Sequence, residues 1–546
     1  MKKLNSVVLF IFLVIFSYIN ISIFNIRFSV ADDYLINNII SGTFGNAYDA
    51  QLLYINNIIG IILKIFYHFI PYINFYTLYL VSVISLCFTL IIKEIINSKK
   101  YILLSVVLII YVLTLFNITF TIIAYLSAML GLIRLACKKD SNIYINGFLI
   151  VNGYLLRSSV LFPILFSLGI LILIRLIKDR DKKYLRNICI VFGSIVICYL
   201  VGNMFYNKTE TLKEFKIWQT ASSNIRDYKI IEYNKYEETL NEIGWNENDV
   251  RLFYTWNFAD KSKFSASKMQ QLVDNIKISD RYNLNIKSII KNFLGQYFLE
   301  EYDFNQIYIL IFIILFIIVL IKCENKAQSM WIFLSCIIIN FILIVRNRYL
   351  YRVIYPQYLI AIIYYIYSIA NSSNINYKNN SIDKHKIKRC LYCISSLVSI
   401  LIVIFYIKQY NEISKKNNDT YLIYNDTVQQ IENDGNLYIV DSSIYNNLTM
   451  NYKITERKKI GEYANIMKAG GGDCFSKRYY DYIERFNLEY KDNLYKNLTN
   501  EKVYYIGYPT DVLNTYLKEN VNENGILEEY KTINNITVYK YKIRDL

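Results

Sequence analysis

The chain has 546 residues, of which 54% are hydrophobic and only 19% are charged. This balance favours a multi-pass membrane protein over a soluble one. The formal net charge is +16, which we attribute to cytoplasmic Lys and Arg that set membrane topology, so no nucleic-acid partner is expected. The 9 Cys scatter among apolar segments, which argues against a disulfide framework.

The first apolar segment covers about 6–24 and follows Met-Lys-Lys, so it could be a signal peptide. It lacks a small-x-small cleavage site, contains Tyr18 and Asn20, and precedes many further apolar segments. We interpret it as a retained signal anchor whose N-terminus is cytoplasmic.

About eleven windows are long and apolar enough to span a membrane as helices. They lie near residues 6–24, 74–96, 101–116, 118–136, 143–158, 160–177, 187–205, 306–322, 328–346, 353–370 and 389–407. A further apolar run, about 51–73, contains Asn56, Asn57, Lys64 and His68.

The run 51–73 decides the predicted topology. If it spans the membrane, the basic loops IRLIKDRDKKYLR and NYKNNSIDKHKIKR face outward, against the positive-inside tendency. If it is an interfacial or re-entrant helix on the outer side, all the basic loops lie inside. We adopt the second topology; an ordinary two-span hairpin with poor charge bias is the alternative.

Two polar regions then lie outside the membrane. The loop 206–305 is too long for a simple connector, and its amphipathic stretches predict helices over the outer membrane face. Within it, NENDV (Asn246–Val250) is typical of a capped helix start. After about 408, NLYIVDSS and KVYYIGYP predict buried strands, each followed by a helix, and ILEEYKTINNITVYKYKI predicts a terminal hairpin.

The predicted organisation is therefore a membrane domain, 1–407, with outer loops 25–73 and 206–305, and a small α/β extracytoplasmic domain, 408–546. GGG at Gly470–Gly472 has neither GxGxxG spacing nor a P-loop Lys-Ser/Thr, so we interpret it as a flexible turn.

An acidic pair, Asp32-Asp33, lies in the first outer loop, within FSVADDYLINNIISGTFG. Adjacent residues on a helix point about 100° apart, so the two carboxyls are not expected to share one proton. One Asp can cap the helix YLINNII, for which Gly42 is a plausible stop. Capping explains one carboxylate, and we expect the other to act in catalysis or ligand binding.

Three Arg follow at the outer end of a later span, in RNRYLYRVIYPQY: Arg346, Arg348 and Arg352. Guanidinium groups bind phosphate bidentately, so the cluster predicts a site for a lipid headgroup or a diphosphate. Snorkelling Arg at the interface, or an ion pair with the acidic pair, is the alternative. Arg157, in GYLLRSSVLFP, could join the same cavity or simply occupy a turn.

No zinc site or Ser-His-Asp set is suggested by the 2 His of the chain. The acidic pair, the short helix at 51–73, the many spans and the outer domain together resemble the GT-C class of integral-membrane glycosyltransferases. NITFTIIAYLSAMLGL, GYLLRSSVLFPILF and GWNENDVRLFYTWNFAD are also similar to stretches of bacterial multi-pass proteins of this kind. The Lys-Pro-Pro that starts the juxtamembrane helix in some relatives is absent, which leaves the acceptor class open.

The resemblance implies a polytopic α-helical fold of about eleven spans with an outer juxtamembrane helix. It implies a polyprenyl-phosphate-linked sugar as donor and a glycan, lipid or protein as acceptor. An Asp of the pair, Asp32 or Asp33, would be the general base, and the Arg residues would bind the lipid phosphate. No cofactor is expected with certainty, although two carboxylates could ligate a divalent metal.

The sequence thus predicts a glycosyltransferase of the plasma membrane that acts on a cell-envelope acceptor outside the membrane. Two alternatives stay open. A transporter or flippase of lipid-linked glycans would need alternating access and often has internal repeats, which the halves of this chain do not clearly show. A non-catalytic membrane scaffold would use the acidic pair only for capping.

Overall fold

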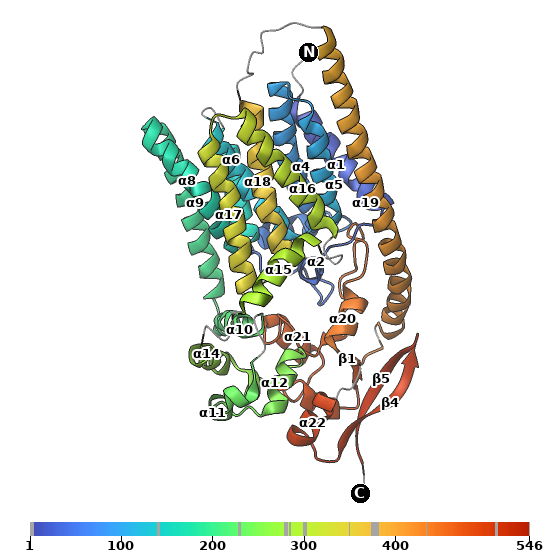
Figure 1. Ribbon diagram of the computed structural model, residues 1–546. Coiled ribbons are helices and arrows are strands. Elements are labelled where there is room, and N and C mark those ends of the chain that lie inside the picture. The colour runs from blue at the N-terminus through green and yellow to red at the C-terminus, as the bar shows by residue number, and fades with distance from the viewer. Residues whose placement is uncertain are drawn as a thin grey trace.

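The computed structural model of the protein describes residues 5–138, 142–227, 231–277, 282, 285–298, 303–348, 350–372, 382–432, 434–507 and 511–544. Long helices form a bundle at one end, and a group of short helices and a small sheet lie at the other end (Figure 1). The N-terminal helix starts at the end of the bundle far from the sheet.

Seven helical segments of the described chain are long and apolar enough to cross a membrane. They are α1 (Ser6–Ile23), α4 (Phe75–Ser98), α6 (Phe120–Cys137), Ser158–Asp179, which contains α8 (Leu161–Asp179), α9 (Lys182–Tyr206), α17 (Lys326–Val345) and α18 (Tyr351–Asn371). Asn or Asp side chains cap several of these helices: Asn74 accepts from Thr77 N in α4, and Asp181 accepts from Lys183 N in α9. The prediction of a helical protein with many apolar segments is confirmed.

Three further predicted windows are also helices, but their apolar stretches are shorter than those of the seven segments above. They are α5 (Leu103–Phe116), α7 (Ile143–Leu156) and α16 (Asp303–Lys322). The window 389–407 lies inside α19 (Ile382–Ile431).

The apolar run 51–73 contains α3 (Asn57–Phe69), a helix of 13 residues. At 1.5 Å per residue it is about 20 Å long, less than the roughly 30 Å of a bilayer core. The amide of Asn56, before α3, donates to Leu155 O near the end of α7. Asn74, after α3, donates to Ile454 O beside the sheet. Both ends of the run therefore lie at the end of the bundle that faces the sheet.

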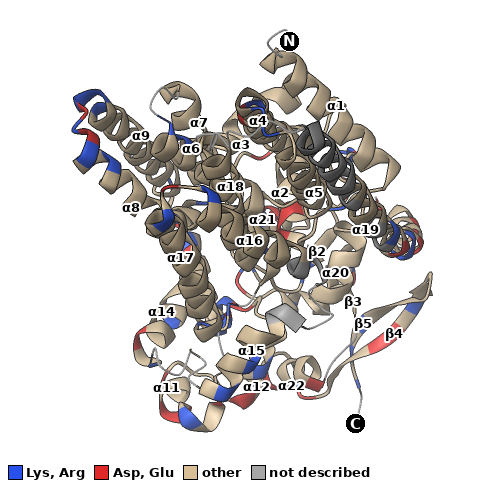
Figure 2. Ribbon diagram, turned by 45° about the horizontal axis from the view of Figure 1, so that its top comes forward, with Lys and Arg blue, Asp and Glu red and all other residues tan. Residues whose placement is uncertain are grey.

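Basic residues gather at the opposite end of the bundle, for example at the turn between α8 and α9 (Figure 2). Lys93 donates to Ser6 Oγ at the start of α1, and Lys100 donates to Ser372 O after α18. A cavity at this end is lined by the C-terminal parts of α6, α8 and α18 and by the connection between α16 and α17, and it includes Lys178 and Lys322. The predicted basic loop 378–389 lies partly outside the described residues.

The predicted outer loop 206–305 folds into short helices next to the sheet. They are α10 (Glu210–Arg226), α11 (Glu237–Glu242), α12 (Glu247–Tyr254), α13 (Lys261–Phe264), α14 (Ala266–Asn275) and α15 (Ile286–Phe298). The helix start predicted at NENDV is confirmed, because Asn246 and Asp249 form a capping box at α12.

Helix α19 has 50 residues and runs along the whole bundle to the sheet (Figure 1). Its length is about 75 Å at 1.5 Å per residue. The predicted domain boundary at 407 therefore lies inside one continuous helix, and the C-terminal part is joined to the bundle without a linker.

The C-terminal part contains a five-stranded sheet in the order β2-β1-β3-β5-β4. Its strands are β1 (Leu437–Val440), β2 (Ile466–Lys468), β3 (Val503–Ile506), β4 (Gly525–Ile533) and β5 (Ile536–Ile543). Strands β1, β2 and β3 are parallel, and β4 and β5 form an antiparallel hairpin. Helices α20 (Ser442–Thr449) and α22 (Asp511–Asn520) follow β1 and β3, and α21 (Lys477–Arg485) follows β2. The two predicted strand–helix pairs and the hairpin are confirmed, whereas β2 was not predicted.

The segment after α20 packs on α2 (Ala31–Ser41) and on the start of α4. Tyr452 Oη donates to Asn38 Oδ1 at 2.7 Å and accepts from Asn37 Nδ2 at 2.8 Å. Ile454 O accepts from Thr77 Oγ1 at 2.6 Å. We call Met450–Glu456 the clasp, since it fastens the C-terminal part to α2 and α4.

Candidate functional site

A cavity of about 670 Å³ lies between the end of the bundle and the C-terminal part. Pockets of about 300–1,000 Å³ commonly hold small ligands. Segments far apart in sequence line it: the residues before α2 and the first turns of α2, the loop between α2 and α3, the start of α18, the loop after α12, and residues at or after the carboxyl ends of β1 and β2. The lining residues that carry the argument below are Asp32, Tyr54, Trp256, Arg352, Ser443 and Lys468.

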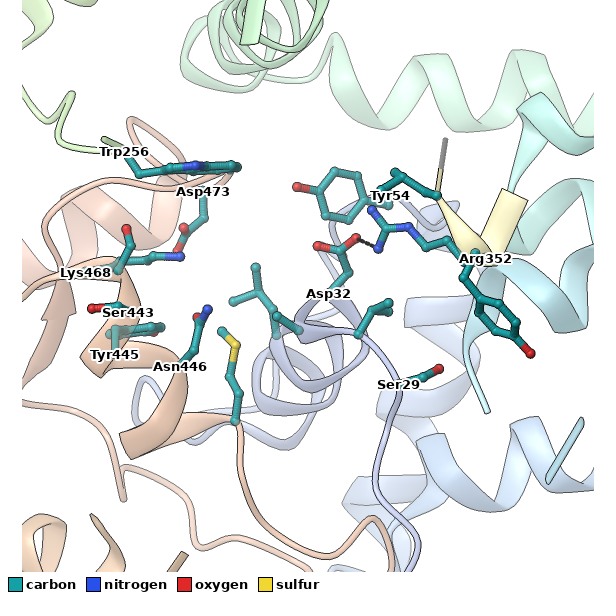
Figure 3. Close-up of a pocket in the computed structure, with 18 residues that line it drawn as sticks. Ser29, Asp32, Tyr54, Trp256, Arg352, Ser443, Tyr445, Asn446, Lys468 and Asp473 are labelled. Atoms are coloured by element: carbon teal, nitrogen blue, oxygen red, sulfur yellow. Dashed lines mark hydrogen bonds and ion pairs between the residues drawn. The ribbon is translucent and has the colours of Figure 1, made fainter. Parts of the chain in front are cut away.

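Asp32 and Arg352 form an ion pair on one wall of this cavity (Figure 3). Arg352 Nη1 donates to Asp32 Oδ2 at 2.7 Å, and both side chains are about a quarter exposed, 22% and 26%. Within the described residues no hydrogen bond to Asp32 Oδ1 is found, and Figure 3 shows this oxygen facing the cavity. One carboxylate oxygen is therefore held by Arg352 while the other is open to a ligand.

Asp33 points away from the cavity into the protein and is completely buried. Its Oδ1 accepts from Tyr76 Oη at 2.7 Å and from Phe120 N, in the first turn of α6, at 2.9 Å. The prediction that one Asp caps its own helix is wrong, because no side chain caps α2. Asp33 instead satisfies a free N–H at the start of another helix. The predicted stop at Gly42 is confirmed, with φ 76° at the C-cap.

Burial raises the pKa of Asp33 to about 7. The folded protein then keeps a proton that the unfolded chain releases near the ordinary value of 3.8. The free energy of unfolding therefore falls as pH rises from 3.8 to about 7, and this contribution is constant above that pH.

We predict that Asp33→Asn removes this dependence, because the amide keeps the acceptor oxygen and cannot titrate. The test measures the unfolding temperatures of the full-length Asp33→Asn variant and of wild type in detergent. The variant's unfolding temperature minus that of wild type should increase as the pH rises from about 4 to 7. Asp49→Asn is the control, since Asp49 lies outside the cavity and accepts only from Gln51 N among the described contacts. A difference between Asp33→Asn and wild type that stays constant with pH would contradict the prediction.

The other predicted Arg residues have separate surroundings. Arg348 pairs with Asp227 at 2.8 Å, and the Arg346 guanidinium lies 5.9 Å from the Tyr282 ring centre. Neither lines the cavity. Of the three clustered Arg, only Arg352 is thus placed beside the acidic pair.

Arg157 lies behind the cavity wall. It donates to Thr121 Oγ1 at 2.6 Å, and its guanidinium lies 5.5 Å from the Phe120 ring centre. Burial and the nearby charge of Arg352 lower the pKa of Arg157, and Asp32 raises it. Arg157 is therefore an electrostatic neighbour of the ion pair, although it does not line the cavity.

The second wall of the cavity comes from the carboxyl ends of β1 and β2. Ser443 follows β1, and Lys468 is the last residue of β2. Because β2 and β3 lie on opposite sides of β1, the connections diverge at this edge. In open α/β sheets, ligands bind outside the carboxyl ends of the strands at such a switch point.

Two aromatic residues, Tyr54 and Trp256, also line the cavity. Tyr54 and Trp256 both have φ of 64°, a left-handed conformation that is uncommon for bulky residues. The Arg226 guanidinium lies 4.1 Å from the Trp256 ring centre and holds that ring from the α10 side. Strained backbone of this kind clusters at ligand sites.

The GGG segment is needed for close packing around this cavity. A Cβ on Gly470 would lie 1.8 Å from Trp256 O, and one on Gly472 would lie 2.4 Å from Tyr54 Oη. The sequence interpretation as a flexible turn missed this role. The glycines allow both aromatic loops to approach the end of β2.

We predict that Gly470→Ala lowers the free energy of unfolding by about 1–3 kcal/mol, since the backbone of Trp256 must move. Thermal unfolding of the purified protein measures the change. Gly193→Ala in α9 is the control, because a Cβ there meets nothing within 4 Å. Equal unfolding temperatures for both variants would contradict the prediction, because they would show that the Trp256 loop can move without lowering the free energy of unfolding.

No group of three or more His, Cys, Asp or Glu in the described part of the chain is arranged to hold a metal ion. Asp32 Oδ2 is already engaged by Arg352. The donor set at the cavity therefore does not fit the divalent metal that the sequence left open, and we derive no step through one.

Asp32 and Arg352, which the sequence singled out, line this cavity, whereas the residues of the opposite wall were not predicted. Strand β2 has only three residues, IMK, too few for an alternating or apolar pattern to stand out. Trp256 lies in GWNENDVRLFYTWNFAD, from which the helix start and a resemblance were inferred but no role for this Trp. The glycines directly after Lys468 were the one signal that could have drawn attention to this turn. No family model matches the chain, and no curated protein matches its sequence.

Proposed function

We propose that the protein is a glycosyltransferase that transfers a sugar from a polyprenyl-phosphate carrier to a cell-envelope acceptor on the outer face of the plasma membrane. The observation that carries this proposal is the Asp32–Arg352 pair, with one open carboxylate oxygen, on the wall of a cavity of about 670 Å³. The cavity lies between the bundle of apolar helices and the C-terminal part, a position that suits a site shared by a lipid-linked donor and a polar acceptor.

The reaction needs a base for the acceptor and a positive charge for the leaving group. Asp32 Oδ1 accepts the proton of the acceptor hydroxyl as the hydroxyl oxygen attacks the anomeric carbon. The bond between that carbon and the phosphate oxygen breaks, and its electron pair leaves with the polyprenyl phosphate. A single displacement of this kind inverts the anomeric centre.

Arg352 supplies the positive charge. In the resting pair its guanidinium contacts Asp32 through Nη1, and its other N–H groups can bind a phosphate at the same time. Arg157 adds a second positive charge behind the wall. Asp33 is assigned a structural role at the start of α6, which leaves Asp32 as the base.

The test is transfer of a labelled sugar by the purified full-length protein in lipid nanodiscs, with a polyprenyl-phosphate sugar as donor and a cell-envelope extract as acceptor source. A labelled product that resists mild acid, unlike the donor, is expected. If no glycosidic product forms but proteoliposomes move the lipid-linked sugar across the bilayer, the transporter alternative replaces the proposal. If neither occurs, the ion pair is structural and the scaffold alternative is favoured.

A further inference from the structure

The ammonium group of Lys468 faces the cavity from the wall opposite Asp32 (Figure 3). Within the described residues, no carboxylate lies within 4.0 Å of its Nζ, and the Nζ donates no hydrogen bond; it lies near two aromatic rings. Burial lowers the pKa of Lys468, and the negative charge of Asp473 raises it. A largely desolvated cation without an anionic partner is costly in a protein unless a ligand supplies the anion.

The nearby carboxylates are already engaged elsewhere. Asp473, which lines the same wall, pairs with Arg478 at 3.1 Å. Asp441 caps α20 and accepts from Ser443 N at 2.9 Å and Ser443 Oγ at 2.6 Å. Neither carboxylate forms an ion pair with Lys468, although the negative charge of Asp473 is close enough to stabilise the ammonium, and the Nζ faces the cavity (Figure 3).

Two aromatic rings beside Lys468 are placed so that a sugar ring could pack against them. The Lys468 Nζ lies 5.7 Å from the Trp256 ring centre and 5.5 Å from that of Tyr445, and both rings line the cavity. Trp256 remains 36% exposed although the fold holds it on a strained backbone. An exposed, fixed indole offers an apolar face that a sugar ring can cover, with polar groups at its edge.

We propose that Lys468 and the Trp256 ring bind an anionic saccharide, so that the acceptor carries a phosphate or a carboxylate. The inference rests on the proposed function, because it assigns the bound sugar to the acceptor. The acceptor hydroxyl then reaches Asp32 across the cavity, while the anion stays at the carboxyl ends of β1 and β2. Arg352, on the other wall, remains available for the donor phosphate.

Saturation-transfer NMR titrations of the full-length protein test the site with three probes: glucose 1-phosphate, glucuronate and glucose. We expect both anions to bind at least about tenfold more tightly than glucose, the gain typical of a charge-assisted contact. The phosphate and carboxylate arms show which anion the site prefers. Equal affinities for glucose and the two anions would overturn the proposal.

Variants locate the binding. Lys468→Gln should remove the preference for the anions, and Lys468→Arg should keep most of it. Lys518→Gln, on an exposed position of α22, is the matched control and should bind all probes like wild type. Retention of the full preference by Lys468→Gln would overturn the assignment.

A second variant guards against misfolding of the first. Asn446→Asp adds a negative charge to the same cavity with almost no change in side-chain shape, because Asn446 lines the cavity beside Lys468. It should weaken both anions and leave glucose binding unchanged. Unchanged anion binding by this variant would also overturn the proposal.

The transfer assay separates this inference from the proposed function. Binding of anions through Lys468 without any transfer from a polyprenyl-phosphate donor would refute the glycosyltransferase and leave the anion site standing. Transfer at equal rates to neutral and anionic acceptors would refute the anion site and leave the glycosyltransferase standing.

Discussion

Replacing Asp32 by Asn is expected to lower the rate of sugar transfer by about 10²–10⁴-fold, the usual contribution of a general base. The amide cannot accept the hydroxyl proton, but it keeps an oxygen for the Arg352 contact at Oδ2. The cavity and the fold should therefore be retained. The measurement is the initial rate of product formation at saturating donor, with binding of the donor followed separately.

Two neighbouring carboxyls serve as controls for that experiment. Asp33→Asn keeps the acceptor for Tyr76 and Phe120 and should transfer sugar at nearly the wild-type rate. Asp49→Asn should do the same, because Asp49 does not line the cavity. Full turnover by Asp32→Asn would remove Asp32 from the mechanism, and full turnover by both Asp32→Asn and Asp33→Asn would remove the acidic pair.

Replacing Arg352 by Gln should lower the rate by about 10²–10³-fold, as expected when one preorganised donor to a developing negative charge is lost. Arg352→Lys should recover part of the loss, since it restores the charge but not the planar fork that binds phosphate bidentately. The rate should fall more than the affinity for the donor, because the leaving phosphate gains negative charge as its bond to the sugar breaks.

Arg348→Gln is the matched control for this Arg substitution. Arg348 lies four residues away, pairs with Asp227 at 2.8 Å and does not line the cavity. It should leave transfer close to wild type. If the two variants lose activity equally, the positive charge of the whole Arg346–Arg352 segment matters and the specific assignment to Arg352 is wrong.

The helical segments and the two strand–helix pairs could be predicted from sequence because their signals are local. Long apolar windows and the capping pattern at Asn246 need no knowledge of the rest of the chain. The sequence suggested an ion pair between the Arg cluster and the acidic pair only as the alternative to a phosphate site, and the structure contains such a pair between Arg352 and Asp32.

The remainder of the site depends on tertiary contacts that the sequence does not reveal. Asp33 meets Phe120, 87 residues later in the chain, only because α2 packs against the start of α6. Lys468 ends a strand of three residues. It lies opposite Asp32 because the clasp binds α2 and so fixes the position of the sheet relative to the helix bundle. The two Asp side chains could be distinguished only once α2 was placed.

The clasp and the continuous α19 have a practical consequence for dividing this protein. Each cavity wall belongs to a different part of the chain, and neither part contains both Asp32 and Lys468. Residues 408–546 produced alone would begin inside a helix and would lose the partners of Tyr452 and Ile454. The membrane part alone would keep Asp32 but lack the far wall. Both parts are therefore needed in one purified protein to obtain the complete cavity. Exchanging the C-terminal part for that of another protein would replace the wall that carries Lys468 and keep the wall that carries Asp32.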